Sequence, residues 1–374
     1  MKRLEKFKID KFFLIAIIIF MIISIINIYS ANKLLYSVSN LALRQIIWYI
    51  IGFILVAIIF IIKNKTIYKY INILYIIGNI LLVCLLLFAP VINNTKSWFS
   101  IPGIGTIQPS EFMKIILIIM LAKTIDKFNS THENPTVFEE FILILKVLFI
   151  TFIPAILTFL QPDTGIVLIY LLITFVMLFI SGIRYRWFFL LFILLGSIVA
   201  FILILFFLNN DLFIDIFGTS FFLRIDRLID WNNNSGYQLT NGIAAIGSGG
   251  LFGFGIANTP IYFPEPQTDF IFAVFANNFG FIGSIALISF IALFDIKLIQ
   301  LAKKTKLGIN SYVISGIIGM LLYQQFQNIG MTFGVIPITG ITLPFISYGG
   351  SSLLSYMLII GIIFNISNEI ETKK

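Results

Sequence analysis

Charged residues, cysteine and histidine are all scarce in this chain. Only 11% of the 374 residues are charged and 59% are hydrophobic, and the mean hydropathy is +1.03. A soluble domain is nearer half apolar and a quarter charged, so the composition excludes a soluble globular protein. The single Cys84 excludes an internal disulfide. With only His132 beside it, a zinc site of the His and Cys type is also disfavoured.

Long apolar runs, by contrast, are abundant. Each is close to the ~20 residues that a helix needs to cross the hydrocarbon core of a bilayer, although the fourth is short. The pattern predicts an all-α polytopic membrane protein with about ten transmembrane helices. The runs are 12–29, 43–62, 67–89, 112–126, 139–160, 164–182, 187–208, 269–296, 309–333 and 345–367.

The net charge of +8 invites a nucleic-acid interpretation, but its distribution argues against one. With the N-terminus inside, most of the 25 Lys and Arg residues fall on inside segments. This asymmetry follows the positive-inside rule, and it predicts that both termini are cytoplasmic. The first apolar run lacks a convincing cleavage site and more runs follow it, so we interpret it as a retained span. The excess of basic residues therefore reflects the orientation of the chain in the membrane, and no nucleic-acid partner is expected.

The chain is predicted to be a single membrane domain, 1–374, with short cytoplasmic loops. Two outer segments stand out, 90–111 and the long extracytoplasmic loop 209–268. A loop of that length in a compact protein is usually functional or disordered. Its apolar spacing is typical of amphipathic helices, so we expect short helices on the outer leaflet.

The most informative stretch, PEPQTDFIF at 264–272, places a carboxylate where the eighth span begins. An acid near membrane depth is costly and is by default a functional hypothesis. The residue, Asp269, is alternatively a first-turn or N-cap acid that the helix dipole favours. The residues alone leave both interpretations open.

Three strings together resemble the SEDS family of cell-wall polymerases, which comprises the bacterial RodA and FtsW proteins. They are AIGSGGLFGFG at 245–255, FPEPQTDFIFAVFA at 263–276 and NIGMTFGVIPITGITLPFISYGGSS at 328–352. The resemblance implies a GT-C-like membrane fold and polymerisation of lipid II into peptidoglycan strands outside the cytoplasmic membrane. It makes Asp269 the catalytic carboxylate, which would act as general base toward a sugar hydroxyl.

The resemblance also implies a class B penicillin-binding protein as partner. The short segment between Gly255 and Pro264 and the short tails are more like RodA, which serves elongation, than FtsW, which serves division. A divalent cation, Mg²⁺ or Mn²⁺, is a further candidate requirement. The sequence does not decide it.

A leaving pyrophosphate needs positive charge nearby. Lys114 lies in the family-like string QPSEFMK at 108–114, although it can also snorkel or pair with Glu111. Arg224 matches the family's loop arginine better than Arg227. Relatives usually show Arg-Trp at the position of Ser97 and Trp98. Because Ser97 replaces that arginine, Lys96 is the candidate to supply the charge.

Four further polar residues are candidates for substrate contacts. Asp163, in QPDTG at 161–165, resembles a family string but is also a candidate N-cap. Glu265 can hold a cation with Asp269, position a sugar or brace the loop. Ser347 and Ser351 open the tenth span beside a predicted re-entrant turn. The glycines of 247–255 either cradle an anion or allow close helix packing.

The chain departs from the family at two places. Gln267 stands where many relatives have His, and Asn277 and Asn278 stand where many have an acidic pair. The missing acids remove two charged partners from the eighth span. They affect the expected role of Asp269 less.

Other functions stay open beside the polymerase. One is a lipid II flippase, although neither inverted repeats nor broken helices are evident in the sequence. Others are a ligase that joins lipid-linked polysaccharide to another acceptor, and a non-catalytic scaffold. The distinctive acids and glycines cluster on the outer side, which favours a one-sided enzyme.

Overall fold

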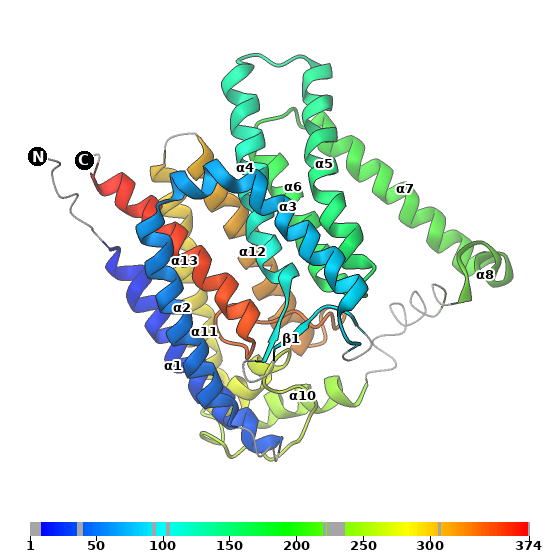
Figure 1. The fold of residues 1–374 in the computed structure, drawn as a ribbon. Coiled ribbons are helices and arrows are strands. Elements are labelled where there is room, and N and C mark those ends of the chain that lie inside the picture. The colour runs from blue at the N-terminus through cyan, green and yellow to red at the C-terminus, as the bar shows by residue number, and fades with distance from the viewer. Residues whose placement is uncertain are drawn as a thin grey trace, which may run out of the picture.

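The computed structural model describes residues 9–35, 40–91, 95–101, 105–219, 222, 236–305 and 308–372. Ten helices of 17 residues or more make up most of this part, which confirms the predicted all-α membrane fold (Figure 1). They are α1 (Lys11–Leu34), α2 (Leu41–Ile62), α3 (Asn64–Phe88), α4 (Pro109–Thr131), α5 (Val137–Phe159), α6 (Thr164–Ile180), α7 (Arg186–Leu208), α11 (Ile271–Lys304), α12 (Ile309–Thr332) and α13 (Gly350–Thr372).

Seven of these helices are long and apolar enough to cross a membrane by length and composition alone. Among the described residues, α6 is apolar but has only 17 residues, whereas α4 and α12 carry more polar side chains. The same ten segments were expected from the apolar runs. Local capping sets several of their boundaries: Asp10 and Asn40 cap α1 and α2, and Thr136 with Glu139 forms a capping box at α5.

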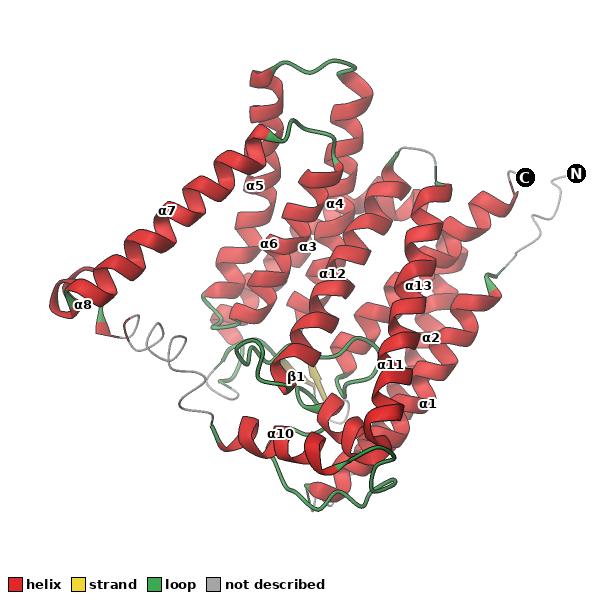
Figure 2. Cartoon of the chain, turned by 180° about the vertical axis from the view of Figure 1, so that it is seen from behind, coloured by secondary structure: helices red, strands yellow, loops and turns green. Residues whose placement is uncertain are grey.

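Several shorter elements lie at the end of the bundle opposite the two termini, where irregular segments gather, whereas the short helix that follows α7 stands to the side (Figure 2). A small antiparallel hairpin of β1 (Phe99–Ile101) and β2 (Gly105–Ile107) precedes α4, and the apolar runs did not predict it. Within the long loop, α8 (Asn210–Phe217) and α10 (Tyr237–Ser248) confirm the expectation of short helices. Their position on a leaflet stays a prediction.

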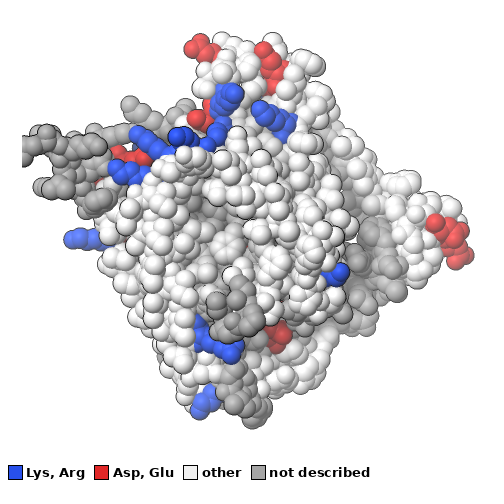
Figure 3. Space-filling model, viewed as in Figure 1, with Lys and Arg blue, Asp and Glu red and all other residues white. Residues whose placement is uncertain are grey.

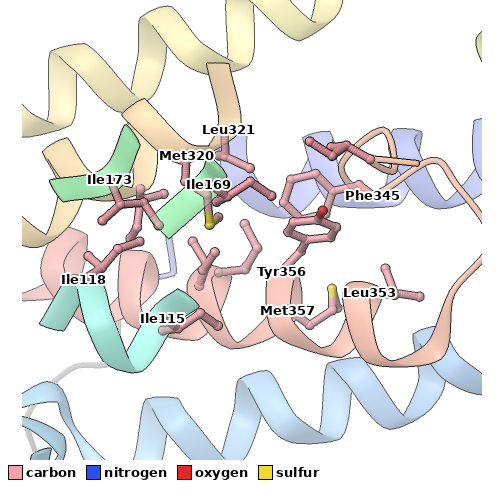
Figure 4. Packing of buried hydrophobic residues seen from close by; sticks show 14 of the residues in the cluster. Ile115, Ile118, Ile169, Ile173, Met320, Leu321, Phe345, Leu353, Tyr356 and Met357 are labelled. Carbon is pink, nitrogen blue, oxygen red and sulfur yellow. The ribbon is translucent and has the colours of Figure 1, made fainter. Parts of the chain in front are cut away.

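The bundle core forms around α13. Its most apolar window is 78% buried, whereas that of α7 is only 6% buried, and Figure 1 shows α7 standing away from the other long helices. Apolar side chains from α4, α6, α12 and α13 meet in this core (Figure 4). Because α7 exposes apolar side chains along its length, its surroundings in the cell must be lipid or another apolar surface.

On the face shown in Figure 3, a wide middle band carries few charged side chains, and most of the basic and acidic ones lie toward its two ends. This arrangement matches a protein whose middle faces hydrocarbon.

Helix α11 is broken at Gly280, which has non-helical backbone angles of φ 66° and ψ −164°. No broken helix was evident in the sequence, and the structure shows this one. The glycine-rich loop seals it, because the amides of Phe254 and Gly255 donate to the carbonyls of Asn277 and Asn278. The loop carbonyls of residues 250 and 251 accept from the amides of 281 and 282 in return.

The glycines of this loop therefore serve close packing of backbone against backbone, one of the two roles expected for them. Gly253 has φ +78°, and a Cβ there would overlap the carbonyl group of Asn278. The asparagines that replace the family's acids are fully buried beside it. Asn277 donates to the Ala245 carbonyl, and Asn278 accepts from the Ser30 hydroxyl of α1. Neutral amides thus hold the broken helix to its neighbours.

Replacing Gly253 with alanine is expected to lower the thermal stability of the purified protein. A non-glycine residue in this backbone region costs about 1–3 kcal/mol, and the overlap with Asn278 adds to it. The matched control is Gly247→Ala, whose Cβ would meet nothing within 4 Å and which lies inside α10. Melting temperatures in detergent that fall equally for both variants would contradict this role for Gly253.

Candidate active site

A cavity of about 730 Å³ opens at the end of the bundle opposite the termini. Its walls come from the start of α2, the hairpin, the starts of α4 and α6, the loop before α11, and the irregular segment between α12 and α13. The segment around Pro337 and Pro344 is irregular, as expected, and whether it re-enters the membrane stays a prediction. Polar and aromatic lining residues include Arg44, Trp48, Trp98, Gln108, Glu111, Asp163, Glu265, Asp269, Gln324 and Tyr348.

Asp269 lies in the turn directly before α11, half-buried at the cavity wall. Within the described part of the chain, its carboxylate has no hydrogen-bond or ion-pair partner. Burial first, and the nearby Glu265 carboxylate second, raise the pKa of Asp269 to about 7. An unpartnered carboxylate with such a pKa is suited to accept a proton at neutral pH.

Three consecutive carbonyl groups hold the Asp269 loop in place. The amide of Tyr348 donates to the Gln267 carbonyl at 2.8 Å, and the Ser347 hydroxyl donates to the Thr268 carbonyl at 2.7 Å. The Asn328 amide donates to the Asp269 carbonyl at 2.9 Å. The segment 328–352 therefore holds the backbone that carries the Asp269 carboxylate, and the carboxylate itself stays free.

Glu265 braces the same loop, which is one of the three roles expected for it. One of its carboxylate oxygens accepts from the Gln267 amide and from the Thr268 hydroxyl, each at 2.9 Å. Glu265 itself has φ +51°, so the turn is tight. Its predicted contacts with a sugar or a cation stay predictions.

Asp163 caps the start of α6 and also lines the cavity. It accepts from the Ile166 amide at 3.2 Å and from the Gln108 side chain at 2.7 Å. Burial, and to a smaller extent the charge of Glu111, raise the pKa of Asp163 to about 6. The N-cap interpretation is confirmed, and its side chain also reaches the cavity.

Lys114 is fully buried behind the cavity wall, on α4. Its Nζ lies 2.6 Å from a carboxylate oxygen of Glu111 and 5.3 Å from the centre of the Tyr356 ring. Glu111, not Lys114, is among the lining residues. The expected pairing with Glu111 is therefore present, and a contact between Lys114 and substrate remains a prediction.

Of the remaining expected residues, some line the cavity and others bond to neighbouring segments. Trp98 lines the cavity, while Lys96 is half-buried near it but does not line it. The Ser351 hydroxyl accepts from the Gln108 amide at 2.9 Å, so it ties α13 to the start of α4. Ser352 lines the cavity where Ser347 and Ser351 do not. Arg224, like Arg227, lies outside the described residues.

Sequence reasoning overlooked three lining residues. Arg44 is the only Lys or Arg among the described residues that line the cavity, and it was counted only as an outer cation. Trp48 packs over Gly350, where an added Cβ would overlap its ring. Gln324 lies in a polar run of α12, and such a run inside a predicted span was an available signal.

Among the described residues, no group of three or more His, Cys, Asp or Glu lies together as a metal site requires. The carboxylates of the cavity are spread over α4, the start of α6 and the loop before α11.

The chain is similar to known proteins along most of its length. A family model described as "Cell cycle protein", covering FtsW, RodA and SpoVE, matches residues 7–372. Stage V sporulation protein E of Bacillus subtilis is 33% identical over 96% of this chain and 96% of its own. A probable peptidoglycan glycosyltransferase FtsW of the same organism is 36% identical over 76% of this chain and 70% of its own.

Two solved structures share the fold. A chain of a peptidoglycan synthase complex that coordinates polymerization and crosslinking superposes with a TM-score of 0.77, at 24% identity over 97% of this chain and 98% of that one. The rod shape determining protein RodA of Thermus thermophilus gives a TM-score of 0.70, at 25% identity over 96% and 97%. With its ten-helix bundle and this match along nearly its whole length, the chain belongs to the FtsW/RodA/SpoVE family, the SEDS proteins.

Proposed function

We propose that the chain is a peptidoglycan glycosyltransferase that polymerises lipid II, with Asp269 as general base. The unpartnered carboxylate at the wall of a large polar cavity carries this proposal. The names of its relatives support it, since several are described as probable peptidoglycan glycosyltransferases.

The reaction joins two lipid-linked sugars. The 4-hydroxyl of one sugar attacks the anomeric carbon of the other, and its proton passes to the Asp269 carboxylate. The bond between that carbon and the lipid pyrophosphate breaks, and the pyrophosphate leaves with the electron pair. Displacement in line inverts the anomeric centre. Arg44 is the described cation on the cavity wall that can stabilise the leaving charge.

A divalent cation would assist by neutralising the pyrophosphate. Protein Mg²⁺ is often held by one or two carboxylates together with substrate phosphates, so a three-ligand protein cluster is not needed. Glu265 would supply a carboxylate for the cation on this wall, beside the Asp269 base.

We place the cavity on the outer side of the cytoplasmic membrane, with both termini inside. The two termini lie at the same end of the molecule and the cavity loops lie at the other (Figure 1). The basic residues favour the terminal end as the cytoplasmic one. A class B penicillin-binding protein is the proposed partner, and a relative of this fold comes from a peptidoglycan synthase complex.

Within the family we propose a role in cell elongation and shape, as for RodA, on the short segment 256–263. The competing roles are division and sporulation, since the curated relatives include FtsW and SpoVE. Depletion in the native cell separates them. Rounded cells support elongation, filaments indicate division, and normal growth with failed spores indicates sporulation.

Polymerisation is expected to rise with pH through an ionisation near pH 7, because the general base must be ionised and the pKa of Asp269 is raised to about 7. Glu265→Gln removes the smaller of the two causes, so the midpoint should move to lower pH. Initial rates of lipid II consumption between about pH 5 and 9 measure both midpoints. An unmoved or raised midpoint in Glu265→Gln would contradict the assignment.

A flippase would move lipid II between the two leaflets and would form no glycan strands. Purified protein in vesicles with fluorescent lipid II and its class B partner should yield long strands that muramidase degrades. Lipid II that changes leaflet without strand formation would support the flippase instead. The polar cavity lies at one end of the molecule, which favours the enzyme. The break in α11 does not argue for a transporter, because backbone groups on both sides of it are hydrogen-bonded to the loop at 250–255.

A further inference from the structure

A second cavity, of about 500 Å³, lies at the other end of the bundle, between α6, α11 and α12. It stands apart from Asp269 and is independent of the proposed reaction. Apolar side chains form most of its walls. The lining residues are Val176, Ile180, Ile299, Ala302, Lys303, Ser311, Ser315, Ile318, Gly319 and Leu322. We call this the α6–α12 groove.

The groove is polar at one end and apolar along the rest. Lys303 is in the last turn of α11, and Ser311 is in the first turn of α12. Leu322 lies eleven residues further along α12, which corresponds to about 17 Å. The groove therefore runs from a helix end to roughly the depth of one leaflet, since the whole hydrocarbon core is about 30 Å thick.

Two hydroxyl groups at the polar end have no partner. Ser315 is only 9% exposed, yet within the described part of the chain its hydroxyl forms no hydrogen bond, and neither does that of Ser311. Both residues line the groove, so their hydroxyls are free to donate to a ligand that accepts hydrogen bonds.

The charge at the mouth is also unbalanced. Lys303 forms no ion pair with any described residue, and no Asp or Glu is among the described residues that line the groove. On the same face of α11, Asp295 lies eight residues deeper, about 12 Å away along the axis, and accepts from Gln325. The mouth thus presents a cation and hydroxyl donors above an apolar channel.

We propose that the α6–α12 groove binds an anionic phospholipid from the leaflet at the end where the two termini lie. Lys303, Ser311 and Ser315 meet the phosphate, and one acyl chain lies against Ile180, Ile318 and Leu322. A transmembrane helix of a partner is the competing occupant. The phospholipid is favoured because the mouth offers a lysine and two hydroxyl donors without an acidic partner among the described lining residues, which suits a phosphate better than an apolar helix.

Native mass spectrometry of the purified protein with equal amounts of phosphatidylglycerol and phosphatidylcholine, matched in acyl chains, tests the proposal. Wild type should retain one phosphatidylglycerol in preference by about fivefold, the factor for one basic side chain near an anionic headgroup. Lys303→Gln should abolish the preference. Lys304→Gln, the adjacent exposed lysine outside the groove, should keep it.

Filling the groove should remove the lipid altogether. Ser315→Leu is expected to lose the bound lipid of either headgroup, and Leu322→Trp gives the same test from the more exposed wall should Ser315→Leu not fold. Equal loss of preference in Lys303→Gln and Lys304→Gln, or a bound lipid that survives filling, would overturn the proposal. If the filled variant keeps its lipid and also no longer copurifies with a single-span partner, a helix of that partner, and not a lipid, occupies the groove.

Discussion

Replacing Asp269 with asparagine is expected to slow lipid II polymerisation by about 100- to 10,000-fold, the usual contribution of a general base. The amide keeps the size and position of the side chain, and the three hydrogen bonds that hold its loop involve backbone carbonyls. The loop should therefore remain in place while proton acceptance is lost. Rates of strand formation with the class B partner near pH 8, above the raised pKa of about 7, measure the effect.

The stability of the same variant separates catalysis from folding. Because the folded protein raises the pKa of Asp269 to about 7, this residue favours the folded state below the ordinary carboxyl pKa. That contribution is lost as the pH rises through about 7. Above that pH the neutral amide of the Asp269→Asn variant avoids burying a charge, so its melting temperature should not fall below that of wild type.

A matched control is Asp295→Asn, which alters a buried carboxylate within α11, remote from the cavity and bonded to Gln325. Its polymerisation rate should stay near that of wild type. Equal loss of rate in both variants would show that any change to the acids of this region harms the protein, and the assignment of Asp269 would lose its support.

Lys114→Met is expected to produce the largest loss of stability among single changes considered for this chain. The lysine is fully buried and its Nζ lies 2.6 Å from Glu111, which is itself only 6% exposed. Removing one partner of a buried pair leaves the other charge uncompensated and costs about 3–5 kcal/mol. Thermal unfolding in detergent should show this as a markedly lower melting temperature.

The double variant Glu111→Gln with Lys114→Met tests the cause. Replacing both charges should restore most of the lost stability, because no buried charge is then left alone. A double variant as unstable as Lys114→Met would show that the lysine is needed for reasons other than Glu111. If the stable double variant polymerises at the rate of Glu111→Gln alone, the predicted contact between Lys114 and pyrophosphate is wrong.

The helices could be predicted because their signal is local. Apolar runs, most of them of bilayer length, located the ten long helices of the described residues, and caps such as Asp10 and Thr136 mark where several begin. The boundaries near the cavity were less predictable. Apolar character was read as one span from 345 onward, yet the stretch before Gly350 is irregular because Ser347 and Tyr348 bond to the Asp269 loop.

The candidate site was predicted only in part, for a physical reason. Asp269, Asp163, Glu265 and Trp98 lie next to distinctive strings, and the structure brings all four to one cavity. Arg44 belongs to no such string, and only the packing of α2 beside α13 brings it there. The role of Ser347 depends on a backbone group far away in the sequence, which no local pattern encodes.

The break in α11 illustrates the same limit of local patterns. Gly280 stands in a continuous apolar run that reads as one uninterrupted span. The helix is interrupted because the loop at 250–255 offers backbone groups that replace the lost helical hydrogen bonds. Neither segment alone predicts the arrangement, since each supplies half of the bonds.

The most direct test of the central claim is the time course of fluorescent lipid II consumption, above the raised pKa of about 7, by wild type and Asp269→Asn, each folded and bound to the class B partner. The account predicts muramidase-sensitive strands from wild type and almost none from the variant. Strands formed at the same rate by both proteins would contradict the role of Asp269.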